Sequence, residues 1–131
     1  MEKGKRITYF YQLPVWIEAR KLVLCVYNYT SKFPKEEKFG IIDQLRRATM
    51  SITANIAEGF GRFHYKEKAH YLYQARGSAI EVQNFIFLAQ DLKYLPKNKA
   101  RELFAQCNEI IKQINKLAKT TRIAHQEIIC S

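Results

Sequence analysis

The fold is decided by the stretch Gln44–Arg62, which reads QLRRATMSITANIAEGFGR. Its apolar residues alternate three and four positions apart, which is the spacing of a buried helix face in a bundle. We therefore expect one amphipathic helix over about residues 39–58, followed by Gly59 and Gly61 as a C-terminal cap and tight turn. The expected buried face consists of Ile42, Leu45, Thr49, Ile52 and Ile56.

The same spacing recurs on both sides of this stretch and predicts three more helices, over about residues 14–33, 65–92 and 98–122. Pro14 suits the first turn of a helix, and Pro34 disfavours helical backbone in the residue before it. Helices joined by short connections pack as antiparallel neighbours. The sequence thus predicts an all-α protein, an antiparallel up-down-up-down four-helix bundle.

Three segments divide the chain: residues 1–12 form a basic and aromatic N-terminal arm, residues 13–123 the four-helix bundle domain, and residues 124–131 a C-terminal tail. For the tail, both an extension of the last helix and a frayed end stay open. The whole chain has 131 residues, of which 47% are hydrophobic, so one domain with a real core is expected.

The composition also bears on the compartment. Three cysteines are widely spaced and form no CxxC pair, which argues against a disulfide framework and suits a reducing cytoplasm. No apolar stretch approaches the roughly 18 residues that span a bilayer, and no secretory signal is evident. We therefore expect a cytoplasmic protein with no membrane partner.

A row of polar residues follows one edge of the helix predicted over 39–58. Arg47 and Glu58 both lie on this edge but are about 16 Å apart along the axis, too far to pair with each other. Our hypothesis is that Arg47 reaches across to Glu81 on the next helix and that Gly77 makes room for it. A solvated flank, a subunit interface and a nucleic-acid contact stay open as alternatives. The full row is Gln44, Arg47, Ser51, Asn55 and Glu58.

No pattern of catalytic or metal-binding residues stands out. Glu67 and His70 have the Glu-x-x-His spacing of di-iron bundles, but such sites need two of these elements and the chain has one. The glycines at 59 and 61 follow a predicted helix rather than a strand, so they form no phosphate-cradling loop. We therefore expect no enzyme activity, no cofactor, no metal and no small-molecule substrate.

Several blocks of the sequence together resemble one known family. The chain is similar to the four-helix bundle proteins encoded in intervening sequences of 23S ribosomal RNA genes, and more distantly to the accessory protein of diversity-generating retroelements. The resemblance implies an antiparallel four-helix bundle that assembles as a cyclic homopentamer, without catalytic residues or cofactor. The matching blocks are Val15-Trp16-x-x-Ala19-x-x-Leu22, Phe33-Pro34-x-Glu36, Gln44-Leu45-Arg46-Arg47-Ala48, Asn55-Ile56-Ala57-Glu58-Gly59-x-Gly61-Arg62 and Ala75-x-Gly77-Ser78-Ala79-x-Glu81.

The net charge of +10 predicts attraction to polyanions, nucleic acid first. The leading hypothesis is a non-enzymatic, homo-oligomeric helical scaffold that binds RNA or DNA through basic surfaces repeated around the ring. The competing hypothesis is a protein-interaction adaptor with an acidic partner and no nucleic-acid role. The candidate nucleic-acid-binding residues are Arg46, Arg47, Arg62, Lys66, Lys68, Lys112, Lys116 and Lys119.

Overall fold

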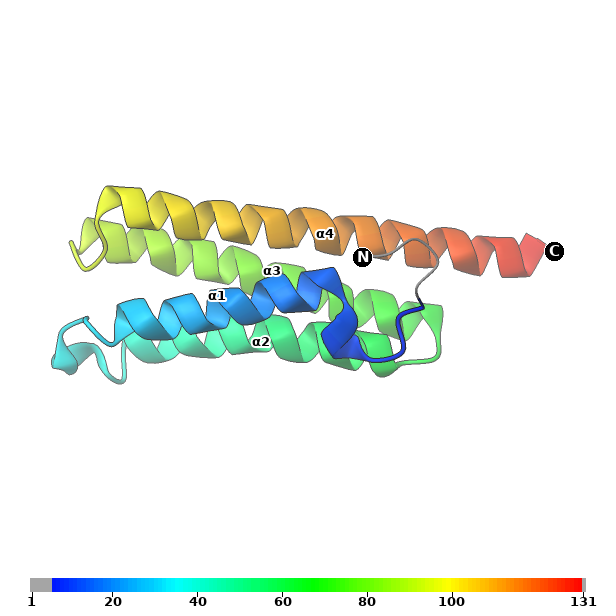
Figure 1. Cartoon of the computed structure of the whole chain (residues 1–131), viewed down its shortest axis with the longest axis horizontal. Helices are drawn as coiled ribbons and strands as arrows, with labels where there is room; N and C mark the ends of the chain where they lie inside the picture. The colour runs from blue at the N-terminus through cyan, green and yellow to red at the C-terminus, as the bar shows by residue number, and fades with distance from the viewer. Residues whose placement is uncertain (1–5, 131) are drawn as a thin grey trace.

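A computed structural model describes the backbone of residues 6–130 and the side chains of residues 6–127. These residues form four long helices and no strand, as the sequence predicts. The helices lie side by side, and the chain reverses its direction along the long axis from each helix to the next (Figure 1). They are α1 (Pro14–Thr30), α2 (Ile41–Gly61), α3 (Tyr65–Asp91) and α4 (Lys97–Cys130), with single 3-10 turns at Phe10–Gln12 and Lys35–Glu37.

Helix α1 ends at Thr30, three residues before the predicted end. The Thr30 hydroxyl donates back to the Val26 carbonyl at 2.7 Å, and the chain then turns so that Phe33 is buried against Tyr94. The two ring centroids are 5.2 Å apart. At the other end of the molecule, α4 continues through the segment assigned to a tail, as far as Cys130.

The predicted role of Gly59 and Gly61 as a cap is wrong, because both lie inside α2 and the cap residue is Arg62. Gly59 serves instead for close packing of two helices. A Cβ atom at Gly59 would lie 3.2 Å from the Tyr71 Cβ and 3.4 Å from the Lys68 carbonyl oxygen, both on α3. A side chain at this position would therefore push α2 and α3 apart.

The core runs along the bundle axis and matches the predicted faces closely in α2 and α3. All five expected positions of α2 and all six of α3 are buried. In α1 the buried face is rotated slightly from the predicted one, since Val15 and Thr30 are buried whereas Trp16 and Tyr29 are partly exposed. The face predicted from the spacing was Trp16, Ala19, Leu22, Val23, Val26, Tyr29 and Phe33. The expected α3 face was Leu72, Ala75, Ala79, Val82, Ile86 and Ala89. A second row beside it was also expected to be buried; its members Tyr71, Ser78 and Phe85 are partly buried, whereas Leu92 is exposed.

Each helix packs against two neighbours. Helix α1 contacts α2 and α4, and α3 contacts the same two helices, so α1 and α3 lie on one diagonal of the bundle. The outward faces of α1 and α3 consequently point to opposite sides of the molecule.

Candidate nucleic-acid interface

Arg46 ties α2 to α1 and is half-buried. Its Nε donates to the Thr30 hydroxyl oxygen at 2.9 Å, and its guanidinium carbon lies 4.4 Å from the centroid of the Tyr27 ring. The two contacts leave Arg46 engaged within the bundle rather than presented to a ligand.

Arg47 does not reach Glu81, so the hypothesis of a bond between these two residues is wrong. Its Nε lies 3.0 Å from both carboxylate oxygens of Asp43, one turn earlier on the same helix. Residues four apart on a helix are neighbours on its surface, so Arg47 reaches Asp43 without crossing to another helix. Glu81 is exposed, and Gly77 makes room for nothing in the described part of the chain, since the space in front of it is open.

Glu58 pairs with Arg62, which lies four residues further along the chain at the C-terminal cap of α2. The Arg62 Nη2 donates to the Glu58 carboxylate at 2.9 Å and to the Tyr71 hydroxyl at 3.0 Å. The Arg62 guanidinium carbon also lies 4.9 Å from the centroid of the Tyr71 ring. Arg62 thus joins the end of α2 to the first turns of α3, and this interaction is structural.

Lys68 and Lys66 have different surroundings although they are two residues apart on α3. The Lys68 Nζ donates to the carbonyl oxygens of Phe60 at 3.2 Å and Gly59 at 3.5 Å, and burial lowers the pKa of this ammonium. Lys66 is exposed, and its ammonium makes no ion pair with a described residue. Of the five candidate residues on α2, at its cap and at the start of α3, Lys66 alone presents its charge freely within residues 6–127.

The remaining polar edge forms a small network between α2 and α3. Ser78 donates from its hydroxyl to the Ser51 hydroxyl oxygen at 3.0 Å, and Asn55 Nδ2 donates to the same oxygen at 3.0 Å. Asn55 also donates to the Ser51 carbonyl at 2.8 Å. Gln44 is exposed at the start of the row.

The candidate basic residues of α4 differ from the arginines of α2 and its cap, which are bonded within the chain. Lys112, Lys116 and Lys119 are all exposed, and none forms an ion pair with a described residue. At about 100° per residue they fall within roughly 60° around the helix, and Arg101 falls on the same face. Arg101 is exposed too, and a helical projection of the sequence would have added it to the candidate set. We call these four residues the α4 basic face.

Two exposed apolar rows were not singled out from the sequence. Tyr73, Ile80 and Phe87 recur every seven residues on α3 and are 49%, 53% and 57% exposed; we call them the α3 stripe. Ile17 and Leu24 have the same spacing on α1 and are 38% and 62% exposed; we call them the α1 stripe. The seven-residue spacing is readable in the sequence, but which apolar residues face outward depends on the packing.

Among the described residues no three histidine, cysteine or acidic side chains come together as a set that could hold a metal ion. No helix within residues 6–130 combines the length and the apolar character needed to cross a membrane.

Comparison with known proteins identifies the family. The profile of the 23S rRNA-intervening sequence proteins matches residues 11–116. A crystal structure of a protein of unknown function from the S23 ribosomal protein family of Bacteroides thetaiotaomicron is 21% identical, covering 80% of this chain and 95% of that one. Its TM-score of 0.74 indicates the same fold. No match was found among curated proteins. The chain belongs to the family of 23S rRNA-intervening sequence proteins.

Proposed function

We propose that this protein is a non-enzymatic scaffold: an antiparallel, up-down-up-down bundle that assembles into a cyclic homopentamer and binds RNA or DNA through basic faces repeated around the ring. The α4 basic face is the observation that carries the nucleic-acid part. Lys112 and Lys116 extend into solvent without a described carboxylate partner, so a phosphate backbone would gain their charge without breaking an existing ion pair.

The other half of the candidate set is less suited to this role. Arg46, Arg47 and Arg62 would each have to give up a hydrogen bond within the chain before contacting a phosphate. Lys68 would in addition have to leave the end of α2. We therefore centre the proposed interface on α4, with Lys66 as an outlying contact.

Two observations support assembly. The α3 stripe and the α1 stripe point to opposite sides of the bundle, and joining two different patches head to tail generates a ring or an open filament. Gly77 lies beside the α3 stripe with open space in front of it, although glycine inside a helix costs about 1 kcal/mol relative to alanine. A neighbouring copy that approaches this backbone closely accounts for the glycine. The number five rests on the family resemblance.

The test of nucleic-acid binding is fluorescence anisotropy with labelled single-stranded and hairpin RNA across a salt series. Wild-type affinity should fall linearly in a plot of log K against log salt. The triple variant K112Q/K116Q/K119Q should bind more weakly, with a slope shallower by about 2 to 3, since each lost phosphate contact removes roughly 0.7 to 0.9.

A matched control separates the α4 basic face from net charge. The triple variant K32Q/K35Q/K38Q loses the same charge from exposed positions around the α1–α2 connection. It should keep most of the wild-type slope and affinity. Equal losses in the two triple variants would contradict a dedicated interface on α4, and no binding by the wild type even at low salt would favour the adaptor with an acidic protein partner.

A further inference from the structure

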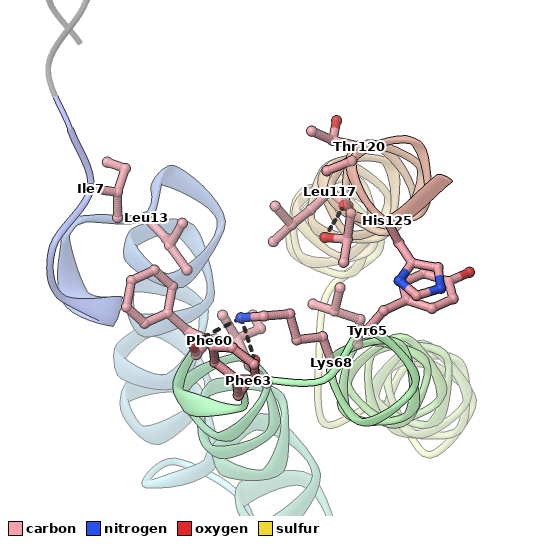
Figure 2. A pocket seen from close by; sticks show the side chains of 14 residues that line it. Ile7, Leu13, Phe60, Phe63, Tyr65, Lys68, Leu117, Thr120 and His125 are labelled. Carbon is pink, nitrogen blue, oxygen red and sulfur yellow. Dashed lines mark hydrogen bonds between the residues drawn. The ribbon is translucent and has the colours of Figure 1, made fainter. Parts of the chain in front are cut away.

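A cavity of about 490 Å³ lies at the end of the bundle where α2 turns into α3. Its volume falls within the roughly 300 to 1,000 Å³ of typical small-molecule sites. Figure 2 shows the walls: Ile7 and Leu13 on one side, Leu117 and Thr120 of α4 on the other, and Phe60 with Phe63 at the end of α2. The N-terminal segment forms one side of the cavity, and α4 forms the other.

The walls are mainly apolar, with one ammonium group among them. Figure 2 shows the Lys68 side chain extending from α3 across the cavity toward Phe60, with its Nζ between the N-terminal side and the α4 side of the cavity. Two of its three N–H bonds point to the carbonyl oxygens of Phe60 and Gly59, and the third has no acceptor among the described residues. The ammonium is partly buried, and an anionic group in the cavity would give its third N–H a charge-assisted hydrogen bond.

The charge of the lining is positive. Among the described residues Lys68 lines the cavity, and neither aspartate nor glutamate does. The His125 ring stacks on Tyr65 with centroids 4.5 Å apart and planes 11° from parallel, which forms a flat aromatic wall between α3 and α4, on the side of the cavity away from Phe60 (Figure 2). The two threonine hydroxyls on α4 already donate to carbonyl oxygens of their own helix.

We propose that this cavity binds a small organic anion, whose apolar body packs between Leu13, Phe60 and Leu117 and whose carboxylate or sulfonate accepts a hydrogen bond from Lys68. The occupant is a monoanion, because one ammonium faces the cavity and its other two protons are taken. An apolar body is required, because the remaining lining offers few donors or acceptors. The site is separate from the α4 basic face and from both stripes, so it does not depend on the proposed scaffold function.

The test compares two fluorescent probes that share an apolar body. 1-Anilinonaphthalene-8-sulfonate carries a sulfonate, and N-phenyl-1-naphthylamine has the same ring system without it. The wild-type protein should bind the sulfonate in a 1:1 ratio, about tenfold or more tightly than the neutral probe, since a charge-assisted hydrogen bond contributes about that much. Decanoate should displace the sulfonate, and decanol should do so more weakly.

Lys68→Met should remove the preference for the sulfonate while the neutral probe still binds. The neutral probe also checks the fold, because Lys68 bonds to the end of α2. Lys66→Met is the matched control, since it removes one charge from an exposed position on the same helix and should keep the preference. An unchanged preference in Lys68→Met would overturn the proposal.

A second pair of variants tests the cavity itself. Ala124→Trp places an indole in the lining and should abolish binding of both probes. Ile123→Trp adds the same ring one residue away, on a side chain that is 42% exposed and lies outside the lining, and should bind as the wild type does. Equal binding by the two tryptophan variants would show that the probes bind elsewhere and would refute the site.

Discussion

The Ser78 hydroxyl on α3 lies 3.0 Å from the Ser51 hydroxyl oxygen on α2 and donates a hydrogen bond to it. This bond crosses the most extensive helix–helix contact of the bundle, and Asn55 completes it by donating to the same oxygen. The polar edge of α2 is therefore anchored across the interface by a small hydroxyl pair. Its charged members, by contrast, are satisfied along their own helix.

Ser78→Ala should lower the free energy of unfolding by about 1 kcal/mol, the usual contribution of one hydrogen bond between partly buried groups. Urea denaturation followed by circular dichroism measures this. A double-mutant cycle with Ser51→Ala should give a coupling energy of roughly 1 kcal/mol between the two hydroxyls.

Thr53→Ala is the control for this cycle, because within the described part of the chain the Thr53 hydroxyl bonds only to the Met50 carbonyl on its own helix. Its removal should leave stability unchanged or slightly raised, since alanine has the higher helix propensity. A coupling energy near zero between Ser51 and Ser78 would show that the crossing bond contributes nothing.

Gly59→Ala and Gly61→Ala should change stability in different directions. A Cβ at Gly59 meets the Tyr71 Cβ and the Lys68 carbonyl, which are both fixed to the α3 backbone, so overpacking should cost about 1 kcal/mol or more. A Cβ at Gly61 meets nothing within 4 Å, and alanine there should be neutral or stabilising. Thermal unfolding of the two variants side by side provides the measurement, and equal melting temperatures would contradict the close approach at Gly59.

Cys107 should make stability fall at alkaline pH. The thiol is fully buried, and burial raises its pKa from an ordinary 9.0 to about 12. Between these values the unfolded chain loses a proton that the folded protein keeps, so the free energy of unfolding falls as pH rises, by up to about 1.4 kcal/mol per unit. Below about pH 8 the thiol is protonated in both states and adds little pH dependence.

The measurement is urea denaturation at pH 8, 9 and 10 for the wild type and Cys107→Ala. The alanine variant is less stable at every pH because it leaves a cavity, but its stability should fall less steeply above pH 9. Other titrating groups are shared by the two proteins, so the difference between their slopes reports Cys107. Parallel curves would mean that the thiol ionises equally well in the folded protein.

Two single substitutions test whether copies join through different faces. Ile80→Glu places a carboxylate in the α3 stripe, and Leu24→Glu places one in the α1 stripe. Both positions are exposed, so the subunit itself should stay folded. Each variant alone should be monomeric by native mass spectrometry, because a carboxylate opposes burial in an apolar contact. Mixed together, they should form a 1:1 dimer through the one intact pair of faces.

The mixing experiment discriminates between interface types. If the α3 stripe paired with itself, Leu24→Glu alone would still dimerise and the mixture would contain no new species. A wild-type protein that is monomeric at micromolar concentration would contradict the proposed ring directly.

The helices and most of their buried faces could be predicted from the sequence, because both depend on residues close together in the chain. Ile52 and Ile56 are buried where their spacing placed them, and Pro14 begins α1. The partner of Arg47 could not be predicted in the same way. An exposed ion pair of Arg47 with Asp43 on the same helix and one with Glu81 on the next helix differ little in free energy. The geometry of the folded chain decides between them in favour of Asp43.

The sequence by itself determined that the chain forms four amphipathic helices, since apolar residues three and four apart can be buried together only in a helix. The tertiary structure alone decided that Gly59 is a packing glycine rather than a cap, and that Lys68 lines a cavity and bonds to the end of α2. Both depend on distances between α2, α3 and the N-terminal segment. Such distances follow from how whole helices pack, and they cannot be predicted from a local pattern of residues.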